Sequence, residues 1–321
     1  MSTPVSGARG VLTLRILFVN VHLVSGDRPG SWVLVDAGLP GSTDRIVRTA
    51  ERRFGRGVPP VAIVLTHGHF DHVGALGDLL ERWDAPVLAH PLELPYLTGR
   101  SPYPPPDPAV GGGAMSFASR LFSRGPIDVG ARVRPLPIDG TLPGLADWRW
   151  IATPGHSPGH VSLIRAGDGT IVSGDAVVTT RQESLASAIT YRPELHGPPA
   201  YFTPDWQQAR ASVERIAALR PNVLTTGHGP PVRGAWVPEG LAWLAENFDR
   251  VVLPRRGRYV RRPARVDETG VVALPPPVTD PVLGAVAAAG LGALTGLALG
   301  AATAPRTRPE GSRASAAPAQ R

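Results

Sequence analysis

The sequence predicts an α/β fold in which short buried strands alternate with helices. Residues 61–65 form an apolar, β-branched run that follows two prolines, which is typical of a buried strand, and residues 73–82 then have the pattern of a helix. Three more short apolar runs each lead through a glycine to a residue that can bind a metal, at 148–156, 171–175 and 222–228. Because ligands of open α/β sheets gather where strands end, we expect these polar residues at one edge of the fold.

The remaining strands are expected on both sides of the first run. Residues 11–24 and 31–35 are predicted to be strands joined by a turn at 26–30, and residues 86–89 are predicted to be another buried strand.

Three helices complete the predicted core. Residues 43–53 and 238–248 have helical patterns, and residues 203–220 have the clearest one. In the last, Thr203 is the expected N-cap and Pro204 the first helical residue. Trp206 lies on the apolar face of this helix, so we expect it in the core.

Residues 66–72, Thr-His-Gly-His-Phe-Asp-His, predict a metal site. Three imidazoles and a carboxylate within seven positions are all ligands of first-row metals. His67 and His69 are two positions apart and can point the same way, whereas Asp71 and His72 fall at the start of a helix and face elsewhere. Two metals are therefore suggested, and the missing ligands must come from other strand ends, where His156, Asp175 and His228 are the candidates.

These residues, taken in order, resemble the metallo-β-lactamase superfamily of metal-dependent hydrolases over roughly residues 10–250. The resemblance implies a four-layer αβ/βα sandwich of two mixed β-sheets flanked by helices. It also implies one metal held by His67, His69 and His156, a second held by Asp71, His72 and His228, and Asp175 as a bridge between them. Asp36, at an earlier strand end, would orient the ligand loop. His160, four residues after His156, is expected to support the structure rather than bind a metal.

The chemistry expected of such a site is hydrolysis. Two divalent ions, zinc foremost and manganese or iron as alternatives, would activate a water to cleave an ester, lactone or thioester in a small-molecule substrate. Asp71 is the candidate catalytic residue, because it could orient that water or carry its proton to the leaving group. An iron-dependent persulfide dioxygenase is the alternative, since the same ligands can hold a redox-active metal.

Other branches of the superfamily match the sequence less well. β-Lactamases are typically exported and lack the bridging aspartate, whereas Asp175 is present here and the N-terminus has no secretory signal pattern. Flavodiiron members have a glutamate in place of His69. The motif at residues 153–160, together with Asp175, looks most like the glyoxalase-type thioesterases and the quorum-signal lactonases. Glyoxalase-type enzymes, however, carry an added C-terminal helical domain for glutathione, and this chain has too little helix-like sequence for one, which argues against a glutathione thioester. A non-catalytic, membrane-tethered module is disfavoured by the intact ligand set.

The charge of the chain argues against a nucleic-acid substrate. The formal net charge is +7, yet residues 1–250 hold 23 Arg and 22 acidic residues, while residues 251–321 hold 10 and 4. A nuclease should carry its positive charge around the active site rather than in a tail. The chain has no cysteine, so disulfides and thiolate metal sites are excluded. It also has no lysine, so all of its positively charged side chains other than histidine are arginines. We expect a cytoplasmic protein.

Three segments are predicted to follow a catalytic domain that spans residues 1–250. Residues 251–280 form an Arg/Pro-rich extension and linker, and residues 305–321 a disordered tail. Between them, residues 281–304 are apolar and rich in Ala, Gly and Leu, with small residues at every fourth position. A membrane or helix-pairing segment, which would anchor the protein, a disordered tail and a packed helix all remain open for this stretch.

Two irregular stretches are expected near the active site. Residues 98–128 are rich in Pro and Gly, which predicts a lid or disorder. Residues 179–203 follow Asp175 directly and contain Tyr191, His196, Tyr201 and Phe202. We expect these two loops to determine which substrate fits.

Overall fold

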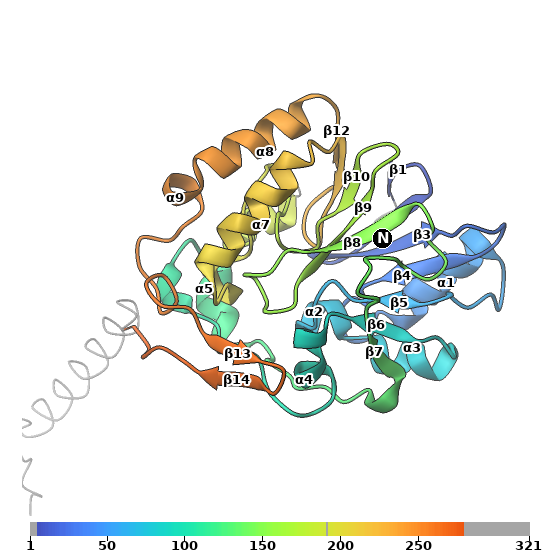
Figure 1. Cartoon of the computed structure of the whole chain (residues 1–321), viewed down its shortest axis with the longest axis horizontal. Coiled ribbons are helices and arrows are strands. Elements are labelled where there is room, and N and C mark those ends of the chain that lie inside the picture. Colours follow the sequence, from blue (N-terminus) through green and yellow to red (C-terminus); the bar gives the residue numbers. More distant parts are fainter. Residues whose placement is uncertain (1–4, 191, 279–321) are drawn as a thin grey trace, which may run out of the picture. The chain divides into compact units, whose positions relative to one another are not determined.

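The computed structural model describes residues 5–190 and 192–278. In the compact unit Met1–Val278, two mixed β-sheets pack face to face, and helices cover their outer faces (Figure 1). The four-layer sandwich implied by the resemblance is confirmed. Residues 279–321 lie outside the described part of the chain, and with them the predicted segments 281–304 and 305–321.

The first sheet contains seven strands in chain order, antiparallel up to β4 and parallel from β4 to β7. They are β1 (Val5–Ala8), β2 (Val11–Ile16), β3 (Val19–Ser25), β4 (Trp32–Val35), β5 (Ile63–Val64), β6 (Val87–Ala89) and β7 (Val133–Pro135). The single strand predicted at 11–24 is wrong. The chain reverses at Leu17, an exposed residue with a φ of 56°, so this stretch forms the hairpin of β2 and β3.

The second sheet contains five strands in the order β12-β11-β10-β9-β8, with a parallel pair only between β10 and β11. They are β8 (Trp148–Ala152), β9 (Val161–Arg165), β10 (Thr170–Val172), β11 (Val223–Thr225) and β12 (Val232–Arg233).

The two-residue period of each strand divides its side chains between two cores. In β4, Leu34 packs into the core beneath the outer helices, whereas Val33 and Val35 pack between the sheets. In β10, Ile171 packs against the helices and Val172 between the sheets. Strands that bury both faces in this way need continuous apolar runs, which is the pattern seen in the sequence.

The helices form the outer layers and the connections. They are α1 (Thr43–Phe54), α2 (Phe70–Val73), α3 (Leu76–Arg82), α4 (Leu94–Leu97), α5 (Ala114–Ala118), α6 (Leu185–Thr190), α7 (Trp206–Ala218), α8 (Trp236–Glu246) and α9 (Phe248–Val251). Short 3₁₀ turns are η1 (Pro91–Glu93), η2 (Pro108–Val110), η3 (Ser119–Leu121), η4 (Gly130–Arg132) and η5 (Ala200–Phe202). α1 and α3 pack on the first sheet, and α7 and α8 on the second (Figure 1).

Two predicted helix boundaries differ in the structure. The ligand-bearing turn forms its own short helix α2, separated from α3 by Gly74 and Ala75. The N-cap of α7 is Asp205, whose side chain accepts a hydrogen bond from Gln208 N, whereas the Thr203 hydroxyl donates to Pro199 O. Trp206 is buried, as predicted.

The segment that follows α9 packs on the same compact unit. It contains the hairpin of β13 (Arg265–Asp267) and β14 (Gly270–Ala273). The Tyr259 hydroxyl donates to Pro105 O at 2.7 Å, and Ala264 N donates to Pro204 O at 3.0 Å. Among the helices of the described residues, none is both long and apolar enough to cross a membrane.

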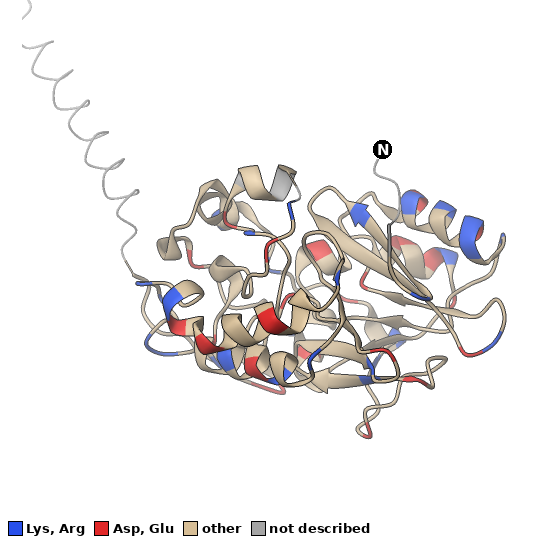
Figure 2. Cartoon of the chain, turned by 90° about the horizontal axis from the view of Figure 1, so that it is seen from above, with Lys and Arg blue, Asp and Glu red and all other residues tan. Residues whose placement is uncertain are grey.

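Charged residues of both signs are interspersed on the outer helices (Figure 2). This distribution agrees with the near balance of charge in residues 1–250.

Candidate metal centre

The structure brings all seven predicted ligands together, and every one of them is buried. The first sheet supplies His67, His69, Asp71 and His72 from the turn between β5 and α3. The second sheet supplies the other three, from the loop before β9 and the loops after β10 and β11: His156, Asp175 and His228.

Backbone hydrogen bonds hold these loops against one another. Val161 N donates to Thr66 O at 2.9 Å, which joins the loop before β9 to the loop after β5. Gly227 N donates to Gly174 O at 2.8 Å, which joins the two loops of the second sheet. The ligand positions are therefore set by main-chain contacts as well as by side chains.

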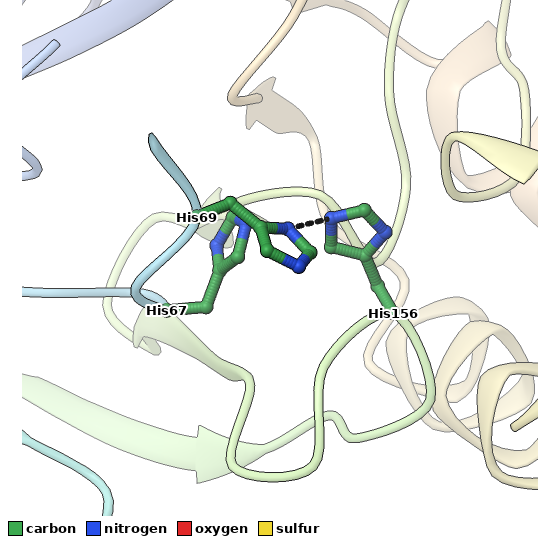
Figure 3. Close-up of side chains that lie close together, drawn as sticks. All are labelled: His67, His69 and His156. Carbon is green, nitrogen blue, oxygen red and sulfur yellow. Dashed lines mark hydrogen bonds between the residues drawn. The ribbon is translucent and has the colours of Figure 1, made fainter. Parts of the chain in front are cut away.

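His67, His69 and His156 form one group of possible ligands (Figure 3). One nitrogen from each lies within 4.8 Å of the others, and His69 Nδ1 is 3.0 Å from His156 Nε2. The Nδ1 of His67 is hydrogen-bonded to Thr66 Oγ1 at 3.0 Å, which leaves Nε2 for the interior of the group.

Asp71, His72 and His228 form a second group, and Asp175 lies between the two. Asp175 Oδ2 is 3.4 Å from His156 Nε2 and 3.0 Å from His228 Nε2. Asp175 Oδ1 is 3.6 Å from His72 Nε2, and Asp71 Oδ2 is 3.5 Å from His228 Nε2. One carboxylate thus faces ligands of both groups.

The donor set fits divalent metal ions. Five imidazoles and two carboxylates supply the nitrogen and oxygen ligands that zinc and similar first-row cations prefer. Three atoms that face the interior have no hydrogen-bond partner within the described chain: His67 Nε2, His72 Nε2 and Asp175 Oδ1. Because buried polar groups are normally paired, these atoms indicate that the site is built to bind cations.

Outer hydrogen bonds fix the ring orientations. Asp36 accepts from His72 Nδ1 at 2.8 Å and from Thr66 N at 2.8 Å, and His228 Nδ1 donates to Phe18 O at 2.8 Å. Each bond occupies Nδ1 and directs Nε2 inward, which is how neighbouring groups orient metal ligands. Asp36 therefore stands where the resemblance implied that it would orient the ligand loop.

His160 has a supporting position. Its Nε2 accepts from Asp175 N at 2.9 Å, so its Nδ1 carries the proton and donates to Thr153 Oγ1 at 2.9 Å. Both ring nitrogens are bonded within the protein, and His160 orients the loop that carries Asp175.

The histidines of the first group are held in the protonation state that binds metal. Burial, followed by the effect of His72, lowers the pKa of His69 to about 3. Burial also holds the pKa of His67 and of His156 well below the ordinary value. Neutral imidazole is the form that coordinates a cation.

The second group balances its charges internally. Burial opposes a charged His72, but the carboxylates of Asp175 and Asp36 outweigh it and raise the pKa of His72 well above the ordinary value. Burial likewise opposes an ionised Asp175, but His228 and His72 outweigh it and hold the pKa of Asp175 well below the usual range. Asp175 is therefore an anion at neutral pH.

Glu93 is a residue at the site that the sequence did not reveal. It is fully buried at the end of η1, and its carboxylate accepts hydrogen bonds from four donors. These donors are Gly68 N, Tyr103 Oη, Ser157 Oγ and Gly159 N. The only signal in the sequence is that Glu93 follows the predicted strand at 86–89, so that it lies at the same sheet edge as His67 and His69.

A small cavity lies over the ligands and has an aromatic wall. Besides the ligands, its lining residues are Phe18, Phe70, Phe122, Pro199, Tyr201 and Phe202. The ring of Phe202 stacks on that of His69 at a centroid distance of 4.7 Å. Phe122 comes from the predicted loop 98–128, and Tyr201 and Phe202 come from the loop 179–203.

Other parts of these two loops serve the structure. The ring of Tyr103 is buried and stacks on Tyr96 at 3.9 Å, so this part of the Pro-rich stretch is packed rather than a lid. His196 pairs through its backbone with Val178. Tyr191 lies outside the described residues.

Comparison with known proteins identifies the family. The sequence model of the metallo-beta-lactamase superfamily matches residues 14–228, which include all seven candidate ligands. The chain belongs to the metallo-beta-lactamase superfamily and is one of its metal-dependent hydrolases.

Individual relatives agree with this assignment. The probable metallo-hydrolase YflN of Bacillus subtilis is 46% identical over 245 residues, 76% of this chain and 93% of the relative. A hydroxyacylglutathione hydrolase of Xanthomonas campestris is 32% identical over 155 residues, 48% of this chain and 44% of the relative. Among solved structures, a beta-lactamase domain protein from Burkholderia ambifaria shares the fold, with a TM-score of 0.51 and 22% identity, covering 77% of this chain and 76% of that one.

Proposed function

We propose that this protein is a dinuclear hydrolase that cleaves an ester, lactone or thioester bond in a small molecule, with zinc as the first choice of metal. The observation that carries the proposal is the position of Asp175. Its two oxygens lie 3.0–3.6 Å from nitrogens of His156, His72 and His228, so one anionic carboxylate can bridge the two ligand groups.

The residues of the site have separate roles in the proposed reaction. When bound, two cations would supply the Lewis acidity that lowers the pKa of a water towards neutrality and polarises the acyl oxygen. The imidazoles, Asp71 and Asp175 would hold these ions, and Asp71 would also orient the water and pass its proton to the leaving group. Burial raises the pKa of Asp71, which favours its action as a proton carrier, and Asp71 also lines the cavity.

The aromatic wall supports a substrate with an apolar acyl group next to the scissile bond. Phe18, Phe122 and Phe202 would contact this group while the carbonyl faces the ligands. Thioester cleavage is further supported by the similarity to the Xanthomonas hydroxyacylglutathione hydrolase, whose name describes a thioesterase.

The test combines metal analysis with a substrate panel. Protein purified without added metal would be measured for zinc, manganese and iron, and then assayed on thioesters, lactones, carboxylic esters and phosphodiesters. We expect about two metal ions per chain, in line with two-metal hydrolases. Turnover should require His69 and Asp175, so that His69→Ala and Asp175→Ala abolish it. His196→Ala removes a histidine outside the ligand groups and serves as the matched control.

Two results would contradict the proposal. Failure to bind metal after reconstitution would remove its basis. One iron per chain with thiol-dependent oxygen uptake would instead identify a persulfide dioxygenase.

A further inference from the structure

Glu93 connects the two loops that supply the first ligand group. Its Oε2 accepts from Gly68 N at 3.0 Å and from the Tyr103 hydroxyl, and Gly68 stands between His67 and His69. Its Oε1 accepts from Ser157 Oγ at 2.8 Å and from Gly159 N at 2.7 Å, and Ser157 directly follows His156. One side chain therefore holds the His67–His69 turn and the His156 loop at a fixed separation.

The glycines at both contacts allow this close approach. A Cβ at Gly68 would lie 2.6 Å from the Tyr103 hydroxyl oxygen, and a Cβ at Gly159 would lie 2.9 Å from Glu93 Cγ. Any larger residue would push the turn or the loop away from the carboxylate. One packed unit next to the ligands is thus formed by Glu93, Tyr103, Gly68 and Gly159.

The supports of the second ligand group are different. His72 is oriented by Asp36, and His228 by the Phe18 carbonyl. The four hydrogen bonds to Glu93 all come from Tyr103 and from the two loops of the first group. Asp71 and His72 follow on the same turn but have no hydrogen bond to Glu93, so a change at Glu93 should act more strongly on the first metal site than on the second.

We propose that Glu93 is a positioning residue that sets the distance between His67 and His69 on one loop and His156 on the other, and so sets the affinity of their metal site. This inference rests on the proposed function, because it requires two metal sites. Outer residues of this kind typically change metal affinity by 10- to 100-fold.

Glu93→Gln is the informative substitution because the volume is unchanged. The amide has one oxygen, so it can serve only one of the two pairs of donors. In either orientation its NH₂ group faces a backbone N–H, that of Gly68 or that of Gly159, and neither can accept a hydrogen bond. One of the two loops must move.

The experiment measures Zn²⁺ affinity by competition with a chromophoric chelator in two backgrounds. His228→Ala leaves only the first site intact, and His156→Ala leaves only the second. We expect Glu93→Gln to weaken zinc binding about 10- to 100-fold in the first background and less than about threefold in the second. Tyr103→Phe removes one of the four donors and should weaken the same site by about threefold.

Asp107→Asn is the matched control. Asp107 is also a buried carboxylate that accepts from backbone N–H groups, those of Ala109 and Arg258, and these lie outside the ligand loops. Its substitution should leave zinc affinity unchanged in both backgrounds.

The outcomes separate the two proposals. If the wild-type protein binds fewer than two zinc ions, the proposed function fails. If it binds two, and Glu93→Gln weakens both sites equally or neither, the positioning role alone is refuted. Should Glu93→Gln not fold, as judged by circular dichroism without metal, Tyr103→Phe decides by the same comparison.

Discussion

The imidazole of His22 should make the protein sensitive to mild acid. This residue is fully buried in β3, where its Nδ1 is hydrogen-bonded to Thr13 Oγ1 at 3.1 Å. Burial lowers its pKa from 6.5 to about 4, with Asp36 working against that shift. The folded protein therefore keeps His22 neutral at pH 5, whereas the unfolded chain takes up a proton there.

The sign and size of the effect follow from this difference. Above pH 6.5, His22 does not lower the free energy of unfolding, because it is neutral in both states. As the pH falls from 6.5 towards 4, the free energy of unfolding decreases, because only the unfolded state gains the proton in that window. At pH 5, about 1.5 units below the unfolded pKa, the loss is about 2 kcal/mol, since each unit corresponds to about 1.4 kcal/mol.

Urea unfolding of the wild type and of His22→Gln at pH 7 and pH 5 tests this reasoning. Glutamine cannot take up the proton, so the free energy of unfolding should fall by about 2 kcal/mol less in the variant than in the wild type. The comparison cancels the contributions of the other titrating groups. Equal falls in the two proteins would show that His22 does not titrate in the way its burial implies.

Three further predictions concern the metal centre. In Asp36→Asn, the new side chain tolerates the φ of 62° at this position but lacks the charge that orients His72. Zinc titration should show binding weakened by about 10- to 100-fold, and unchanged affinity would refute the orienting role of Asp36. A Cβ at Gly227 would collide with the Asp175 carboxylate, so Gly227→Ala should lower kcat by about 100-fold or more while circular dichroism is unchanged; full activity would show that the position of Asp175 is not critical. Phe202→Ala removes the ring stacked on His69 and should raise KM for substrates with long apolar acyl chains by about tenfold relative to acetyl substrates; equal changes for both would exclude Phe202 from acyl recognition.

The sequence was sufficient to predict the buried strands and the candidate ligands because both leave local signals, whereas the four-layer arrangement followed from the family resemblance. Each strand that ends at the site is a short apolar run, and the residue that follows a glycine there can bind a metal, as at Asp175 and His228. These signals need no knowledge of distant contacts. Hence the order of motifs predicted a cluster that the structure assembles from seven residues in four loops of the two sheets.

What the sequence could not predict depends on contacts between distant segments. Asp205 rather than Thr203 caps α7, because the Thr203 hydroxyl is bonded to Pro199 O. Glu93 is a single carboxylate between leucines and prolines, and nothing in this local pattern distinguishes it from a solvent-exposed residue of a turn. Only the folded chain brings Gly68 and Gly159 to its carboxylate. Tyr103 was hidden in a Pro-rich stretch whose composition indicates a loop but not its burial.

The division of the ligands between the two sheets has a consequence for how long the protein survives in the cell. In the first group, His67 and His69 come from the first sheet and His156 from the second. In the second group, His72 comes from the first sheet and His228 from the second. Each bound ion would thus link one sheet to the other, and its binding energy would add to the free energy of unfolding. Copies without metal would lack this contribution, so they should unfold and be degraded by proteases more readily, and metal supply would govern the amount of enzyme as well as its activity.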